Sequence, residues 1–191
     1  MNICVYGAAS NQIDRKYIEA TEHLGELMAR QGHMLVFGGG GSGVMGATAR
    51  GMTRGGGKIF GVAPTFFADG VLYDQCTELH RTETMRQRKQ MMEDNADGFI
   101  MAPGGIGTFE EFFEILTLKQ LNRHEKPIVV LNVDGYYDKL LAFMDYVAAE
   151  GFMNESCKEL YHTVETAEQA LDYLAHYQAH MRSTAEYKNL R

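Results

Sequence analysis

The chain has 191 residues, of which 45% are hydrophobic and 23% charged, and its formal net charge is −7. This length is typical of one domain that buries enough surface to fold without a metal or a disulfide. The acidic balance argues against broad binding to nucleic acids, which relies on a basic surface. Cys4, Cys76 and Cys157 lie far apart, so no zinc site or disulfide framework is expected and a reducing, cytoplasmic location fits best.

The sequence carries no signal for targeting or membrane insertion. Residues 2–6 are predicted to form a strand, and no basic region followed by an apolar region indicates a signal peptide. No apolar run approaches the roughly 20 residues that a membrane-spanning helix needs. We therefore expect neither a membrane nor a nucleic acid as a partner.

Short apolar runs alternate along the chain with segments of helical periodicity. The runs predict strands at 2–6, 34–37, 59–62, 78–81, 98–101 and 128–131. A first helix is expected between Asp14, which can cap it, and Gly32, and further helices at 44–54, 83–95, 108–122, 137–150 and 166–180. Residues 65–76 are expected to form an irregular loop. Residues 1–181 are thus predicted to be a single domain, and residues 182–191 a polar C-terminal tail.

This alternation predicts an α/β fold, a Rossmann-like domain with a doubly wound parallel sheet and helices on both faces. Three strands end in turns of small residues, at 7–10, 38–43 and 102–108. In such folds the carboxyl ends of the strands lie along one edge, where ligands bind. The convergence of three such turns predicts a nucleotide-sized site.

The stretch from Ala102 to Glu111 predicts a phosphate site. It reads Ala-Pro-Gly-Gly-Ile-Gly-Thr-Phe-Glu-Glu and joins an apolar strand to a helical pattern. Glycines allow a ligand to approach bare N–H groups, and the first turn of a helix favours an anion. A carboxylate beside a phosphate cradle suggests chemistry on a phosphorylated small molecule.

Two interpretations of Glu111 remain open at this point. Thr108-x-x-Glu111 has the spacing of a capping box, in which Glu111 would reach back to the amide of Thr108. Alternatively, Glu111 faces the ligand, where a carboxylate stabilises the oxocarbenium-like state of glycosidic cleavage and orients water. Glu110 should point elsewhere on the helix.

A cluster of cations, Arg86, Arg88 and Lys89, lies near the start of a predicted helix. Such a run is commonly a solvated helical face. Because the adjacent strand ends in the phosphate turn, Arg88 and Lys89 can also place positive charge and hydrogen-bond donors above the ligand.

The match Gly41-x-Gly43-x-x-Gly46 follows a strand and opens a helix, as a dinucleotide fingerprint does. The chain has 21 glycines, so chance matches are easy, and a tight turn with close helix packing explains the pattern equally well. The acidic residue about 20 positions on that would contact a ribose is missing from a strand end. No Gly-Lys-Ser/Thr follows either glycine loop, so ATP or GTP hydrolysis is not expected.

Together these motifs resemble the LOG family, the cytokinin riboside 5′-monophosphate phosphoribohydrolases. The resemblance rests on Pro103-Gly104-Gly105-x-Gly107-Thr108-x-x-Glu111 and Met85-x-x-Arg88-Lys89, supported by 5–10, 35–46 and 61–64. Departures are Arg86, where a histidine is common, and the first turn, Gly-Ala-Ala-Ser rather than Cys-Gly-Ser-Ser.

The resemblance implies a Rossmann-like homodimer that needs no metal or other cofactor. It implies hydrolysis of the N-glycosidic bond of AMP or an N6-substituted AMP, a nucleoside 5′-monophosphate, to the free base and ribose 5-phosphate. Arg88 and Glu111 would be the catalytic pair. The 5′-phosphate would be held by Gly104, Gly105, Gly107 and Thr108, and other substrate contacts would come from Ser10, Gly39, Gly40, Met85 and Lys89.

Two other functions are weighed against this one. A carrier of the same fold, like the molybdenum-cofactor carrier proteins, would bind a nucleotide-like cofactor without turnover. An NAD-dependent oxidoreductase rests on the weak Gly41–Gly46 match alone. The presence of both Arg88 and Glu111 favours the enzyme.

Overall fold

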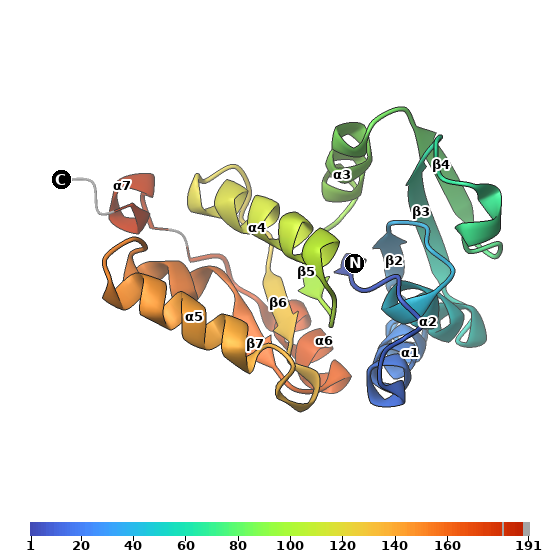
Figure 1. The fold of residues 1–191 in the computed structure, drawn as a ribbon, viewed down its shortest axis with the longest axis horizontal. Helices are drawn as coiled ribbons and strands as arrows, with labels where there is room; N and C mark the ends of the chain where they lie inside the picture. Colours follow the sequence, from blue (N-terminus) through green and yellow to red (C-terminus); the bar gives the residue numbers. More distant parts are fainter. Residues whose placement is uncertain (181, 189–191) are drawn as a thin grey trace.

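The sheet is parallel throughout and occupies the centre of the fold (Figure 1). The computed structural model describes residues 1–180 and 182–188. Within these residues the strands are β1 (Asn2–Tyr6), β2 (Met34–Phe37), β3 (Lys58–Pro64), β4 (Glu78–Thr82), β5 (Gly98–Met101), β6 (Ile128–Leu131) and β7 (His162–Val164). Their order is β4-β3-β2-β1-β5-β6-β7, and every neighbouring pair is parallel. The predicted α/β class and six predicted strands are confirmed. The sequence analysis missed β7, which has three residues and lies at the edge.

Helices cover both faces of this sheet. They are α1 (Arg15–Arg30), α2 (Gly43–Arg54), α3 (Met85–Asp94), α4 (Ile106–Gln120), α5 (Asp138–Ala149), α6 (Ala167–His176) and α7 (Thr184–Tyr187). Short 3₁₀ turns are η1 (Asp69–Val71), η2 (Val133–Gly135) and η3 (Glu155–Leu160). One apolar core joins the sheet to α1, α2 and α6, and a second joins its other face to α3, α4 and α5. The doubly wound arrangement follows, because parallel strands buried on both faces need a helix layer on each.

Helix α1 begins where the sequence predicted. Asp14 is its N-cap, and the Asp14 side chain accepts a hydrogen bond from the backbone N–H of Lys16 at 3.0 Å. The helix ends at Arg30, and Gly32 then takes a φ of +75°. This left-handed conformation favours glycine, so the turn into β2 follows directly from the sequence.

Helix α4 begins at Ile106 rather than at Thr108. Gly105 takes the N-cap position and no side chain caps the helix. The capping-box interpretation of Thr108 and Glu111 is therefore wrong, because Thr108 lies inside the first turn and is buried. Reciprocal capping occurs instead on α3, where Thr84 and Gln87 bond each other's backbone amides.

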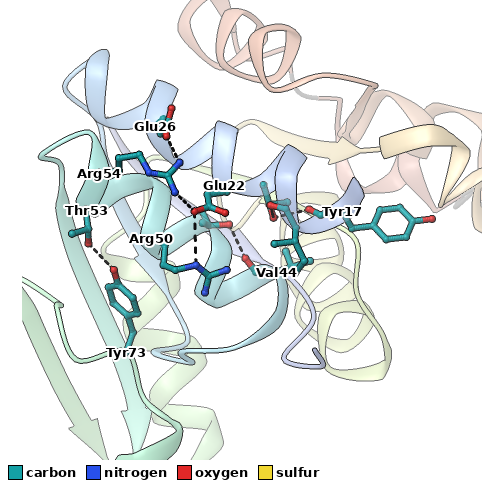
Figure 2. A network of polar contacts seen from close by, with 11 residues as sticks. Tyr17, Glu22, Glu26, Val44, Arg50, Thr53, Arg54 and Tyr73 are labelled. Atoms are coloured by element: carbon teal, nitrogen blue, oxygen red, sulfur yellow. Dashed lines mark hydrogen bonds and ion pairs between the residues drawn. The ribbon is translucent and has the colours of Figure 1, made fainter. Parts of the chain in front are cut away.

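Helices α1 and α2 pack closely enough to require glycine. A Cβ on Gly25 would lie 2.1 Å from the carbonyl oxygen of Thr48, and one on Gly51 would lie 1.9 Å from that of Glu22. At the outer edge of the contact, Arg54 bridges Glu22 and Glu26 (Figure 2). This contact fixes α2 against α1, and with it the small-residue turn before α1 and the glycine-rich turn before α2.

The C-terminal segment differs from the predicted tail. Helix α6 ends at His176, and residues 184–187 form α7. Tyr187 is buried; its hydroxyl accepts a hydrogen bond from the backbone of Arg182, and its carbonyl accepts one from Cys157. The segment is hydrophilic overall, so its composition did not indicate that Tyr187 is buried. Residues 189–191 of the predicted tail, and residue 181 of the predicted domain, lie outside the described residues.

Across the described parts of the chain, none of the helices has the length and apolar character needed to cross a bilayer.

Replacement of Gly51 by alanine tests the close contact of α1 and α2. Alanine is favoured over glycine by about 1 kcal/mol in a helix interior, but the clash with Glu22 should dominate and lower the free energy of unfolding by about 1–3 kcal/mol. Urea unfolding measures the change. Gly70→Ala is the matched control, because its Cβ would meet nothing within 4 Å. Equal stability of the two variants would contradict the packing argument.

Candidate active site

A cavity of about 390 Å³ lies at the carboxyl ends of the central strands. The order of the sheet changes direction at β1, whose neighbours are β2 and β5, and ligands bind at such a switch point in parallel sheets. The turn after β1 and the first turn of α4 form two walls, and further side chains come from Met45, Phe67, Met85 and Arg88. The volume falls in the range of about 300–1,000 Å³ that is usual for small-molecule sites.

An ion pair between Arg88 of α3 and Glu111 of α4 lies at this cavity. The Arg88 Nη1 donates a hydrogen bond to the Glu111 Oε1 at 2.8 Å. The Arg88 Nε donates to the carbonyl oxygen of Val62, at the end of β3, at 3.2 Å. The guanidinium is therefore held from two directions, and its orientation is set before any ligand arrives.

Burial makes this pair electrostatically significant. Arg88 is 5% exposed and Glu111 9% exposed. Burial raises the pKa of Glu111 above its usual range, while the charge and hydrogen bond of Arg88 act in the opposite direction. Arg88 thus offsets part of the free-energy cost of desolvating the Glu111 carboxylate. A buried carboxylate needs such a nearby cation to stay ionised.

Gly38, just after β2, makes room for the guanidinium. A Cβ there would lie 1.8 Å from the Arg88 Nη2. Because Gly38 has no side chain, the loop after β2 leaves the space that the guanidinium of the ion pair occupies. The sequence predicts either nucleotide contact or a tight, closely packed turn for this loop, and it does not indicate the space that Gly38 leaves for Arg88.

The first turn of α4 lines the cavity with residues whose backbone amides precede the helical hydrogen bonds. The N–H of Phe109 makes the first helical bond, to the carbonyl of Gly105 at 2.9 Å, so the amides of 106–108 lie before the helical ladder. A Cβ on Gly105 or Gly107 would meet nothing within 4 Å, and both glycines line the cavity. A ligand can therefore approach the N-terminal end of α4 closely. This end carries partial positive charge, which favours an anionic ligand.

Lys89 and Glu110 lie differently from the sequence interpretation. Lys89 forms ion pairs with Glu110 and with Glu114, the latter at 2.6 Å, and does not line the cavity. Arg88 and Lys89 leave the helix about 100° apart, and of these two only Arg88 lines the cavity. Glu110, which was expected to point elsewhere, lines the cavity beside Glu111.

The other predicted contact residues divide into two groups. Ser10, Met85 and Thr108 line the cavity. Gly39 and Gly40 do not; the carbonyl of Gly39 accepts a hydrogen bond from Tyr73, and Gly40 forms a bridge with Leu72. Gly104 also lies off the lining, and its Cβ position is filled by Thr108 at 2.1 Å.

The Gly41–Gly46 match is explained by packing. Gly43 has a φ of +61°, and its Cβ would lie 2.4 Å from the carbonyl oxygen of Ala8. A Cβ on Gly46 would lie 2.2 Å from that of Gly41. Gly43 thus allows close contact with the turn after β1, and Gly46 allows α2 to pack on its own preceding turn, so the tight-turn interpretation accounts for both glycines.

Met45, Phe67 and Ile106 also line the cavity and were not predicted. Nothing in the spacing of Phe67 could have found it, because it lies in the loop after β3. Among residues 1–180 and 182–188, no group of three or more His, Cys, Asp or Glu side chains is placed to hold a metal ion.

Comparison with known proteins relates the chain to a large family. A family model described as possible lysine decarboxylase matches residues 45–174. A probable cytokinin riboside 5′-monophosphate phosphoribohydrolase of Oryza sativa subsp. japonica is 40% identical, covering 92% of this chain and 78% of that protein. A cytokinin riboside 5′-monophosphate phosphoribohydrolase of Arabidopsis thaliana is 37% identical, covering 92% and 83%.

Solved structures share the fold at lower identity. The molybdenum cofactor carrier protein of Chlamydomonas reinhardtii superposes with a TM-score of 0.70 at 21% identity, covering 91% of this chain and 95% of that one. The molybdenum cofactor binding protein of Rippkaea orientalis gives 0.69 at 21% identity, covering 91% and 93%. These structural similarities show a shared fold.

The buried pair predicts a specific pH dependence of stability. Because the folded pKa of Glu111 is raised, the folded state binds more protons than the unfolded state between the two pKa values, and stability falls as pH rises through that window. Arg88→Met should extend the window upward and cost about 3–5 kcal/mol where Glu111 is ionised.

Chemical denaturation near pH 5 and near pH 8 measures this difference. The double variant Arg88→Met with Glu111→Gln is the control, since it removes both charges and should recover most of the loss at the higher pH. Other titrating groups are common to all three proteins. An Arg88→Met penalty that is the same at both pH values would contradict the assignment.

Proposed function

Since this chain belongs to the LOG family, we propose that it hydrolyses the N-glycosidic bond of AMP or an N6-substituted AMP. The products are the free base and ribose 5-phosphate. The relatives at 37–40% identity are named for this reaction on cytokinin riboside 5′-monophosphates. The observation that carries the proposal is one cavity that joins a buried carboxylate–guanidinium pair to an open helix N-terminus.

Glu111 is the catalytic carboxylate in this proposal. Cleavage of an N-glycosidic bond develops positive charge on the ribose ring, and a fixed carboxylate beside it stabilises that charge. Glu111 also orients the water whose oxygen bonds to C1′ as the bond from C1′ to the base nitrogen breaks. The water keeps one proton as the new C1′ hydroxyl, and its other proton passes by way of Glu111 to the departing base. Its burial strengthens both effects, because charges interact more strongly away from bulk water.

Arg88 keeps this carboxylate ionised and fixed. Its hydrogen bond to Glu111 and its second bond to Val62 leave little freedom for either side chain. Such preorganisation matters because the charge then needs no rearrangement during the reaction.

The first turn of α4 binds the 5′-phosphate in this proposal. Gly105, Gly107 and Thr108 line the cavity on the same helix that carries Glu111. One turn of helix rises about 5.4 Å, which matches the short span between a ribose 5′-phosphate and C1′. Ser10 and Met85, on the facing walls, complete the nucleotide contacts.

The name of the matching family model suggests a different chemistry, lysine decarboxylation. A pyridoxal enzyme needs a lysine that forms a Schiff base with the cofactor. In the described part of the chain, the residues around the cavity include no lysine. The residues present fit glycosidic hydrolysis better.

We also propose that the protein acts as a homodimer in the cytoplasm. Phe113 of α4 and Phe143 and Tyr146 of α5 are exposed aromatic side chains, the last two 60% and 58% exposed. Exposed aromatic groups of this kind are typical of surfaces that another protein covers. Light scattering of the purified protein measures the assembly, and a monomer at working concentration would contradict it.

Substitution of the catalytic pair tests the reaction. Glu111→Gln and Arg88→Ala should each lower turnover of AMP and of N6-isopentenyl AMP by about 10²–10⁴-fold, measured as release of ribose 5-phosphate. Glu114→Gln is the matched control, one turn further along α4 and outside the cavity. Tight binding without turnover in the unmodified protein would favour the carrier alternative instead.

Substitution of Gly107 tests the phosphate position. Gly107→Ala and Gly107→Val place side chains of increasing size where the structure leaves open space. The KM for AMP should rise modestly for alanine and by about tenfold or more for valine, while the urea midpoint changes little, because the new atoms displace ligand rather than protein. A valine variant with an unchanged KM would place the phosphate elsewhere.

A further inference from the structure

Three consecutive carbonyl oxygens in the glycine turn are each held by a hydrogen bond from another part of the chain. The Ala102 oxygen accepts from the Tyr137 hydroxyl at 2.7 Å, and the Gly104 oxygen accepts from the Tyr136 hydroxyl at 2.8 Å. Between them, the Pro103 oxygen accepts from the backbone N–H of Ala8 at 3.1 Å. Two neighbouring tyrosine hydroxyls thus hold the carbonyl groups on either side of Pro103.

These bonds determine where the amides of the turn point. A trans peptide is planar, with its C=O and N–H directed to opposite sides, and no cis bond is present among the described residues. Fixing the Gly104 oxygen on Tyr136 therefore fixes the N–H of Gly105 on the opposite side. Gly105 lines the cavity, so its amide direction is set by a hydroxyl group that does not line the cavity.

The tyrosines are themselves presented by a rigid turn after β6. The Asn132 Oδ1 accepts a hydrogen bond from the backbone of Tyr137 at 2.6 Å. Asp134 and Gly135 have φ angles of 50° and 70°, a left-handed pair that reverses the chain sharply. Lys16 forms an ion pair with Asp134, and this contact ties the turn to α1.

We propose that Tyr136 and Tyr137 are positioning residues for phosphate binding, which hold the Ala102–Gly105 turn with its amides aimed into the cavity. The proposal rests on the proposed function, because it assigns the α4 end of the cavity to a 5′-phosphate. Neither tyrosine lines the cavity. Both act through the backbone, and their contribution is preorganisation of donors before the ligand binds.

The two tyrosines differ in what their removal would test. Tyr137 is 1% exposed, so its replacement by phenylalanine leaves a buried carbonyl without a donor and lowers stability as well. Tyr136 is 40% exposed. Tyr136→Phe keeps the ring that packs edge-on against Tyr17 and removes the hydroxyl alone, so it isolates the orientation of Gly104 and Gly105.

The test is calorimetric binding to the Glu111→Gln protein, in which AMP should stay uncleaved during the titration. AMP and ribose 5-phosphate are titrated into this protein with and without Tyr136→Phe. The dissociation constants of both ligands should rise by the same factor, roughly three- to tenfold for one neutral hydrogen bond, with the urea midpoint unchanged. Tyr173→Phe, which removes one hydroxyl from α6 away from the cavity, should change neither constant.

Any other pattern in these titrations overturns the inference. Unchanged affinity for ribose 5-phosphate would show that the Tyr136 hydroxyl does not set the phosphate-binding amides. A loss for AMP alone would place its effect at the base, and a loss with a lowered midpoint would make it structural. If the unmodified protein binds both ligands but releases no base from AMP, the proposed hydrolysis is refuted. The positioning role of Tyr136 and Tyr137 in phosphate binding would still hold.

Discussion

The buried ion pair between Arg88 and Glu111 is the constraint around which the site is arranged. Two charges removed from water carry a desolvation cost that only close pairing and further hydrogen bonds offset. The structure supplies both, through the 2.8 Å contact and the bond from Arg88 to Val62. It also clears the space that the guanidinium occupies by placing glycine at position 38. Elements β2, β3, α3 and α4 therefore meet at one pair of side chains.

Close backbone approach is the second condition, and glycine provides it repeatedly. Gly25 and Gly51 allow α1 and α2 to touch, and Gly43 allows the turn after β2 to press on the turn after β1. These contacts bring strand ends that are distant in sequence to one edge of the sheet. A side chain at Gly43 would clash with Ala8, which lines the cavity, although Gly43 itself does not line it.

The fold alone does not identify the chemistry. Molybdenum cofactor carrier and binding proteins share this architecture at about one-fifth identity, and a fold of this kind hosts many functions. What distinguishes an enzyme is the site itself. Here the buried carboxylate, its guanidinium partner and the open helix end lie within one cavity, which is why the proposed function is argued from those groups.

The sequence by itself determined the class of fold, because continuous apolar strands alternating with amphipathic helices have few other solutions. It also placed the glycine turns at strand ends and singled out Glu111 and Arg88, since unusual residues in a strand–turn–helix context stand out locally. It could not decide the roles that depend on direction. How helices α3 and α4 pack decided whether Glu111 capped a helix or met Arg88, and whether Lys89 faced the cavity or Glu114. The same packing places the guanidinium of Arg88 against Gly38. Tyr136 and Tyr137 illustrate the same limit, because more than 30 residues separate them from the carbonyls that they hold and only the tertiary structure brings them together.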